Sequence, residues 1–204
     1  MIEREVKLGA ADSFRLPDLT GAVPGATVRA LARRELDATY YDTSDRALAA
    51  RGTTLRHRTG EGSPRWTVKL GRESGSHVMA REEIDVDGPA GDVPDAVRAL
   101  VDDVIGRSAL VPVARLVSAR DTLEVVAVDH APLAEVDDDL VRVFEGDVEV
   151  GSFREVEVEL ASDAPESVLD QLVQRIRDAG AGDPDPTSKL VRALRLIDAA
   201  GSTS

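Results

Sequence analysis

The first seven residues carry two carboxylates and one ammonium group at a spacing of two. Glu3, Glu5 and Lys7 would point to the same face of a β-strand, because successive side chains of a strand alternate between its faces. Such a face either contacts solvent or lines a polar cavity that holds a metal ion and an anion together. The other charged strands help to decide between these two interpretations.

Two further segments with alternating patterns concentrate charge of one sign on one face. Arg56 and Arg58 share a basic face, whereas Glu155, Glu157 and Glu159 share an acidic one. Each pattern alone is typical of an antiparallel sheet with one solvated side. Three carboxylates at this spacing, however, repel one another unless a cation lies among them. Together the segments favour the cavity interpretation.

The residue types indicate which ligands such a cavity would hold. Carboxylates without histidine or cysteine are hard oxygen ligands and suit Mg²⁺ or Mn²⁺ better than zinc. Arginine and lysine side chains on the opposing wall suit phosphate oxygens. A closed barrel with basic residues on one side and carboxylates on the other would therefore bind a metal–polyphosphate complex.

The composition of the whole chain excludes several other classes of function. Its 204 residues carry a formal net charge of −13, which makes a general nucleic-acid or membrane-surface role unfavourable. Aromatic residues make up 3%, too few to provide stacking platforms for nucleic acid. There is no cysteine, and the three histidines lack zinc spacing. No apolar run approaches the length of a membrane span, and we expect a cytoplasmic protein.

Hydrophobic periodicity predicts a mainly β, α+β protein. Strands are predicted at 2–8, 39–42, 53–59, 65–70, 77–86, 114–120, 123–129, 133–136, 140–144 and 153–160. Turns are predicted at 60–64, 71–75 and 137–139, and helices at 45–51, 93–105, 165–179 and 188–199. We expect one domain over residues 1–200 and a disordered tail at 201–204.

An ordered set of motifs resembles the CYTH domain of the triphosphate tunnel metalloenzymes. It starts with Glu-x-Glu-x-Lys at residues 3–7 and continues with Leu-Arg-His-Arg at 55–58, Trp-Thr-Val-Lys at 66–69, Arg-Glu-Glu-Ile at 81–84, Phe-Arg-Glu-Val-Glu-Val-Glu-Leu at 153–160 and Ser-Lys-Leu-Val-Arg-Ala-Leu at 188–194. The segments Tyr-Tyr-Asp-Thr at 40–43 and Ala-Glu-Val-Asp-Asp-Asp at 134–139 are similar to those of CYTH domains joined to CHAD, a helical polyphosphate-binding module. A C-terminal CHAD domain in a longer parent chain is therefore expected.

The resemblance implies an eight-stranded antiparallel β-barrel tunnel with helices packed outside, and a requirement for Mg²⁺ or Mn²⁺. The residues that would grip phosphate are Lys7, Arg56, Arg58, Lys69, Arg81, Arg120 and Lys189. Those that would hold metal ions are Glu3, Glu5, Asp137, Glu155, Glu157 and Glu159, with Glu135 as a neighbouring candidate. Glu5, Lys7, Lys69 and Lys189 are the residues expected to be catalytic.

Two positions depart from patterns found in the family. Ser118 stands where a second basic residue often precedes the position of Arg120, and Arg115 has the wrong parity to replace it. Thr54 stands where thiamine triphosphatases tend to have a tryptophan. The chain is therefore predicted to hydrolyse inorganic tripolyphosphate to pyrophosphate and phosphate. The alternatives are a non-catalytic polyphosphate- or triphosphate-binding module, a thiamine triphosphatase, and a class IV-type adenylate cyclase.

Overall fold

A computed structural model describes residues 2–71 and 79–202, and within them eight antiparallel strands close into a barrel. These strands are β1 (Ile2–Ala10), β3 (Arg34–Asp42), β4 (Thr54–Thr59), β5 (Arg65–Leu70), β6 (Met79–Asp87), β7 (Val111–Ala127), β8 (Pro132–Glu145) and β9 (Val148–Leu160). Their order is β7-β3-β4-β5-β6-β1-β9-β8, and a β7–β8 pairing closes the ring. The predicted eight-stranded antiparallel barrel is confirmed.

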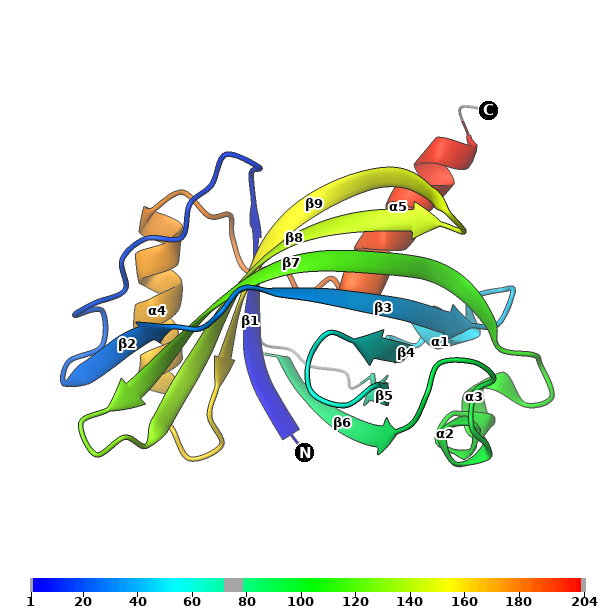
Figure 1. The fold of residues 1–204 in the computed structure, drawn as a ribbon, viewed down its shortest axis with the longest axis horizontal. Coiled ribbons are helices and arrows are strands. Elements are labelled where there is room, and N and C mark those ends of the chain that lie inside the picture. Colours follow the sequence, from blue (N-terminus) through cyan, green and yellow to red (C-terminus); the bar gives the residue numbers. More distant parts are fainter. Residues whose placement is uncertain (1, 72–78, 203–204) are drawn as a thin grey trace.

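Several strands are longer than the sequence patterns predict. The segments 114–120 and 123–129 belong to the single strand β7, and the segments 133–136 and 140–144 belong to β8. A further short strand, β2 (Ala26–Ala30), pairs with β7 outside the ring and was not predicted. The far ends of β7 and β8 extend beyond the barrel next to β2 (Figure 1).

The turn predicted at 137–139 is wrong, because these three aspartates lie in the middle of β8. Asp137 and Asp139 each form an ion pair with Arg120, at 2.5 and 2.6 Å. Asp138, on the opposite face, pairs with Arg154 at 2.6 Å. Aspartate clusters are common in turns. Here neighbouring strands supply a cation to each carboxylate, and the extended conformation is kept.

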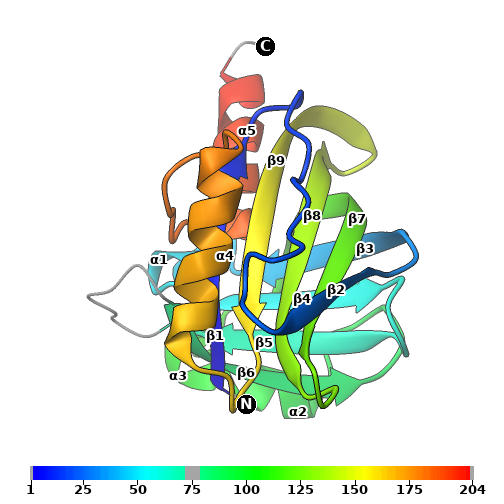
Figure 2. The same ribbon diagram turned by 90° about the vertical axis from the view of Figure 1, so that its left-hand side faces the viewer.

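Helices cover the outer face of the barrel on two sides. α2 (Asp95–Ala99) and α3 (Asp102–Ile105) pack with Leu55 and Trp66, which alternate away from the basic residues of β4 and β5. They replace the single helix predicted at 93–105. α4 (Glu166–Asp178) packs on the outer apolar residues of β1, β8 and β9, and Figure 2 shows it in front of β1 and next to β9. The short α1 (Ala47–Ala50) follows β3.

The last helix, α5 (Lys189–Gly201), departs from the expectation that helices pack outside. Its buried residues Leu190 and Leu194 cluster with Tyr40, Leu116 and Val141, which share the inward parity of the charged residues on their strands. These inner positions are apolar at this end of the barrel, so an amphipathic helix can cover them. α5 therefore closes one end of the tunnel and brings its first residue inside.

The same helix also changes the predicted boundary of the tail. α5 runs through Gly201 and is capped by Ser202, whose hydroxyl donates to the carbonyl of Asp198 at 2.8 Å. The helix thus reaches one residue into the predicted tail, and residues 203–204 lie outside the described part of the chain. None of the helices described is long and apolar enough to cross a membrane.

Leu172→Ala should destabilise the protein by about 2–5 kcal/mol, because Leu172 of α4 is fully buried against the barrel and its truncation leaves a cavity. Urea unfolding measures this change. Val148→Ala is the matched control, since Val148 is 66% exposed and its truncation should change the stability by no more than about 0.5 kcal/mol. Equal stability of the two variants would contradict the packing of α4.

Candidate active site

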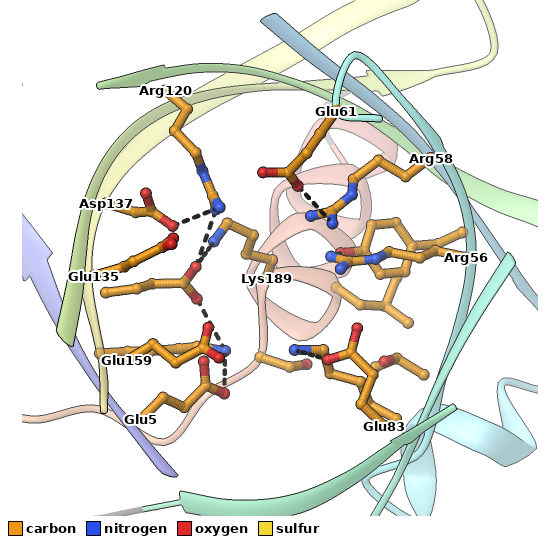
Figure 3. Close-up of a pocket in the computed structure, with 17 residues that line it drawn as sticks. Glu5, Arg56, Arg58, Glu61, Glu83, Arg120, Glu135, Asp137, Glu159 and Lys189 are labelled. Carbon is orange, nitrogen blue, oxygen red and sulfur yellow. Dashed lines mark hydrogen bonds and ion pairs between the residues drawn. The ribbon is translucent and has the colours of Figure 1, made fainter. Parts of the chain in front are cut away.

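The barrel encloses a charged cavity of about 130 Å³ (Figure 3). Its lining comes from all eight ring strands, the β4–β5 loop and the start of α5. The lining residues are Glu5, Lys7, Tyr40, Thr54, Arg56, Arg58, Glu61, Lys69, Glu83, Arg120, Glu135, Asp137, Glu157, Glu159, Ser188, Lys189 and Leu190. In Figure 3 α5 lies behind the cavity, with Lys189 near its centre.

One wall of the cavity is formed by cations of β4 and β5. Arg56 and Arg58 alternate inward on β4, and Lys69 of β5 comes next to them across the sheet. Arg56 donates to the hydroxyl of Tyr40 at 3.5 Å, and Lys69 pairs with Glu83 at 2.9 Å. The proximity of Arg56, followed by burial, lowers the pKa of Arg58 to about 10. The two neighbouring guanidinium groups repel each other, so an anion bound between them would be stabilised.

The opposite wall is formed by carboxylates of three adjacent strands. Glu5, Glu159 and Glu135 are successive Cα partners across β1, β9 and β8, and Glu157 pairs in the same way with Asp137. Figure 3 shows this group facing Arg56 and Arg58 across the cavity. Loss of water contacts raises the pKa of Glu159 to about 7 and that of Asp137 to about 6. Burial thus outweighs the neighbouring cations at these two carboxylates.

Lys7 and Glu157 connect the two kinds of group. The Lys7 ammonium lies 3.2 Å from Glu5 and 3.1 Å from Glu157. Burial lowers the pKa of Lys7, but Glu157 and Glu5 outweigh it, so the pKa is raised above its ordinary value. Burial acts to raise the pKa of Glu157, but Lys189, Lys7 and Arg120 hold it well below its ordinary value. Both groups are therefore ionised near neutral pH.

Lys189 occupies the centre of a cluster of three carboxylates. Its Nζ lies 3.0 Å from Asp139, 2.6 Å from Glu155 and 2.7 Å from Glu157. These carboxylates are close enough together to hold a metal ion, but the ammonium group lies among them. Burial lowers the pKa of Lys189, yet Glu155, Glu157 and Asp139 raise it well above its ordinary value. The cluster therefore holds a permanent cation.

The structure brings most of the sequence-predicted site residues into one cavity. Those that line it are Glu5, Lys7, Arg56, Arg58, Lys69, Arg120, Glu135, Asp137, Glu157, Glu159 and Lys189. Glu155 does not reach the cavity surface, because its side chain is fully buried beneath Lys189. Glu3 and Arg81 are Cα partners across β1 and β6, but their side chains lie outside the described part of the structure.

Some lining residues were not predicted to belong to the site. Glu83 shares the inward face of β6, so its parity could have indicated it. Ser188 lines the cavity because it is the N-cap of α5. Its hydroxyl accepts a hydrogen bond from the backbone N–H of Val191. Glu61 lies in the β4–β5 loop, where no periodic signal exists. Arg115, which has the wrong parity to replace a basic residue at the position of Ser118, lies on the face opposite to Arg120 and pairs with Asp37 at 2.6 Å.

Comparison with known proteins places the chain in a family. Residues 1–191 match the CYTH domain, and the chain belongs to this family. The family includes metal-dependent triphosphatases. Two uncharacterized proteins of Mycobacterium tuberculosis, from strains CDC 1551 and H37Rv, are each 30% identical over 209 residues, which cover 95% of this chain. The chain spans about 40% of the length of these relatives.

Solved structures from several organisms share the fold. A Bacillus halodurans protein, provisionally assigned as an adenylate cyclase, aligns over 94% of this chain and 96% of its own length, with a TM-score of 0.61 and 20% identity. The PH1819 protein of Pyrococcus horikoshii aligns over 95% and 98%, with a TM-score of 0.54 and 19% identity. A Hippeastrum protein aligns over 94% of both chains, with a TM-score of 0.51 and 17% identity.

Glu159→Gln should change how the stability of the metal-free protein depends on pH. The pKa of about 7 in the folded state lies above the ordinary 4.5, so the folded protein keeps a proton that the unfolded chain loses. The free energy of unfolding contributed by Glu159 therefore falls as the pH rises from 4.5 to about 7. Glutamine cannot ionise, so the variant should lack this fall. Urea unfolding on both sides of the window measures the effect.

The matched control is Glu149→Gln, on the same strand but with its side chain 46% exposed at the surface. This variant should retain the wild-type pH dependence. A Glu159→Gln variant with unchanged pH dependence would show that the carboxylate does not hold a proton in the folded, metal-free protein.

Proposed function

We propose that this CYTH domain is a metal-dependent triphosphatase that hydrolyses inorganic tripolyphosphate to pyrophosphate and phosphate. The supporting observation is the separation of charge inside the closed barrel, with Arg56, Arg58 and Lys69 on one wall and Glu5 and Glu159 on the other. Cations on one side can bind phosphate oxygens while carboxylates on the other hold divalent ions. In the Hippeastrum protein, described as provisionally an adenylyl cyclase, triphosphatase activity is dominant.

The cavity supports a substrate that consists of phosphate alone. Its volume of about 130 Å³ is below the roughly 300–1,000 Å³ of typical organic-ligand pockets. Among the described lining residues Tyr40 is the sole aromatic, and it is 3% exposed, so its ring offers little surface for stacking. Thr54, at the position where thiamine triphosphatases tend to have a tryptophan, is buried in the lining. A nucleobase or a thiazole ring would find few contacts.

The carboxylate wall fits Mg²⁺ or Mn²⁺. Its donors are oxygens of Glu5, Glu135, Asp137, Glu157 and Glu159, which are hard ligands. Burial raises the pKa of Asp137 and of Glu159, and a divalent ion bound beside these carboxylates would favour their ionised forms. A bound divalent ion would neutralise phosphate oxygens and lower the pKa of a coordinated water. Glu3, whose backbone lies on the same strand as Glu5, is a further proposed ligand.

The basic residues would bind and orient the substrate. Lys7, Arg56, Arg58, Lys69, Arg120 and Lys189 are proposed to contact its phosphate oxygens, with Arg81 of β6 added from its position in the sequence. Because the charges are fixed by the barrel, they stabilise the charge of the transferring phosphoryl group without reorganisation. A water then attacks the terminal phosphorus atom. The bond between this phosphorus and the bridging oxygen breaks, and pyrophosphate leaves. A carboxylate of the acidic wall accepts the proton of the water.

Asp139 and Glu155 would act through Lys189 and would not hold metal. Both carboxylates are fully buried, and both contact the Lys189 ammonium. A metal ion at this position would have to displace a lysine that three carboxylates retain. We therefore assign Glu155 as a positioning residue for Lys189, in place of the metal-ligand role expected from the family resemblance.

The non-catalytic polyphosphate-binding module is kept as the second candidate. It is favoured by the ion pairs of Arg120 with Asp137 and Asp139. These carboxylates neutralise part of the positive charge that catalysis would need for binding phosphate. Ser118 also lies on the inward face, where a basic residue would add a contact. A C-terminal CHAD domain in a longer chain, and a cytoplasmic location, stay predictions.

The purified protein should release phosphate from tripolyphosphate with Mg²⁺ or Mn²⁺ much faster than from ATP or thiamine triphosphate. Removal of divalent ions with EDTA should abolish the reaction, because the carboxylate wall would then lack its cation. A colorimetric phosphate assay measures all three substrates, and cyclic AMP is measured in parallel for ATP. Equal or faster turnover of an organic triphosphate would overturn the substrate assignment. Binding of tripolyphosphate without release would favour the binding module.

Arg56→Ala should lower kcat/KM for tripolyphosphate by about 10- to 100-fold, the usual effect of losing a hydrogen bond to a charged group. Arg56 lines the cavity, and the hydrogen bond that the substitution removes is a long one, 3.5 Å from the guanidinium group to the Tyr40 hydroxyl. Arg115→Ala, on the outer face of β7, is the control and should keep wild-type turnover. Comparable loss in both variants would contradict the location of the site.

Glu155→Gln should lower turnover of tripolyphosphate but leave the affinity for Mn²⁺ nearly unchanged, because Glu155 supports Lys189 and does not reach the cavity. Glu159→Gln should weaken Mn²⁺ binding directly. Titration of Mn²⁺ followed by electron paramagnetic resonance measures both affinities. A strong loss of Mn²⁺ affinity in the Glu155→Gln variant would show that Glu155 is a metal ligand after all.

A further inference from the structure

The β4–β5 loop places a carboxylate at the edge of the cavity, on the side where phosphate would bind. Glu61 pairs with Arg58 at 2.8 Å and also with Arg34, the first residue of β3 (Figure 3 shows the Glu61–Arg58 contact). Two guanidinium groups on one carboxylate form an anion-binding arrangement, because arginine binds carboxylate and phosphate through the same donors. Glu61 therefore occupies a position suited to a phosphate group.

The backbone holds the loop against the start of β3. Gly60 has a φ of 96°, and a side chain there would place its Cβ 2.0 Å from the carbonyl oxygen of Glu35. Only glycine allows this close approach. The adjacent Glu61 is thereby kept above Arg34, and its backbone carbonyl accepts a hydrogen bond from Arg65 at 3.2 Å.

Arg34 has a second anchor that does not depend on Glu61. Its Nη2 donates to the hydroxyl of Thr122 at 2.9 Å, and this hydroxyl donates to Asp137 at 2.5 Å. Arg34 is thus fixed to the acidic wall while its Nη1 faces Glu61. If the Glu61 carboxylate moved away, Arg34 would stay at the edge of the cavity and could bind another anion.

The three side chains are accessible from the open side. Arg34 is 26% exposed, Glu61 25% and Arg58 13%, so an anion from solution can reach them. Arg58 also needs an anion, since Arg56 is its neighbour. In the protein without ligand, Glu61 supplies the negative charge that a phosphate would otherwise supply.

We propose that Glu61 is an internal competitor of the substrate: its carboxylate occupies an anion subsite formed by Arg34 and Arg58, and a terminal phosphate of tripolyphosphate displaces it. Arg34 is thereby a further substrate-binding residue. This inference deepens the proposed function and rests on it for the identity of the ligand. Glu61 then sets the affinity, because every substrate must first break its two ion pairs.

The test is the affinity for inorganic tripolyphosphate of wild type, Glu61→Gln and Arg34→Gln, measured by calorimetry in EDTA and as KM with Mg²⁺. Glu61→Gln should bind about fivefold more tightly, the factor that corresponds to an ion pair of about 1 kcal/mol. Arg34→Gln should bind more weakly. In the double variant the gain from Glu61→Gln should shrink, because one of the two competing contacts is already absent.

Glu149→Gln is the control, since Glu149 pairs with Arg142, its side chain is 46% exposed and it does not line the cavity, so its loss should leave the affinity unchanged. Glu61→Asp, with a shorter side chain, serves as a second variant and should fall between wild type and Glu61→Gln. Unchanged or weaker binding by both Glu61 variants overturns the inference, even if the wild type hydrolyses tripolyphosphate. Tighter binding by Glu61→Gln without turnover in any variant supports the inference and rejects the proposed triphosphatase. Absence of binding to all proteins overturns both.

Discussion

The neutralisation of buried charge inside a closed barrel is the interaction on which the rest of the structure depends. An ionised side chain removed from water without a partner costs several kcal/mol, and the inner faces of β1, β4, β8 and β9 carry many such groups. Lys189, whose ammonium contacts Asp139, Glu155 and Glu157, is one example. Because the protein already provides counter-ions for its own cations, ligand binding becomes an exchange of partners. Phosphate oxygens would replace carboxylates on the basic residues, and divalent ions would take up the carboxylates that are released.

The same enclosure separates the local electrostatics of the tunnel from those of the whole molecule. A formal net charge of −13 produces a field that repels free polyanions and attracts divalent cations. Inside the barrel, the basic wall offers a polyphosphate a positive environment. A metal–phosphate complex, which carries less negative charge than the free anion, is therefore the form that this molecule would admit most readily. Cation recruitment by the acidic exterior and anion binding by the interior would then act in sequence.

Alternation along the strands predicted a mainly β protein and put Glu5, Lys7 and the charged residues of β4 and β9 on polar faces, because parity decides which face a side chain occupies. The eight-stranded barrel, and the inclusion of Arg120, Asp137 and Lys189 in its site, followed from the family resemblance. Parity does not decide depth, so Glu155 and Glu157 were equivalent in the sequence although one is fully buried and the other lines the cavity. The amphipathic pattern of α5 predicted a buried stripe but not that it would pack against the inner side of the barrel. Asp137–Asp139 resembled a turn because their counter-ions come from residues distant in the chain. Glu61 has no periodic neighbours, and its role depends on how the loop packs on β3.

The alternating pairs of the three aspartates in β8 also have a consequence for folding. Asp137 and Asp139 face Arg120 on the inside, whereas Asp138 faces Arg154 on the outside. A shift of β8 by one residue would turn Asp138 inward and both neighbours outward, and every one of these pairs would be lost. Where the inner face of a long strand is polar, the alternation of apolar residues alone distinguishes the native register from the shifted one less sharply. The charged residues proposed to bind the ligand therefore also destabilise a shifted register of β8. The same side chains thus determine both the chemistry of the tunnel and the correct pairing of its strands.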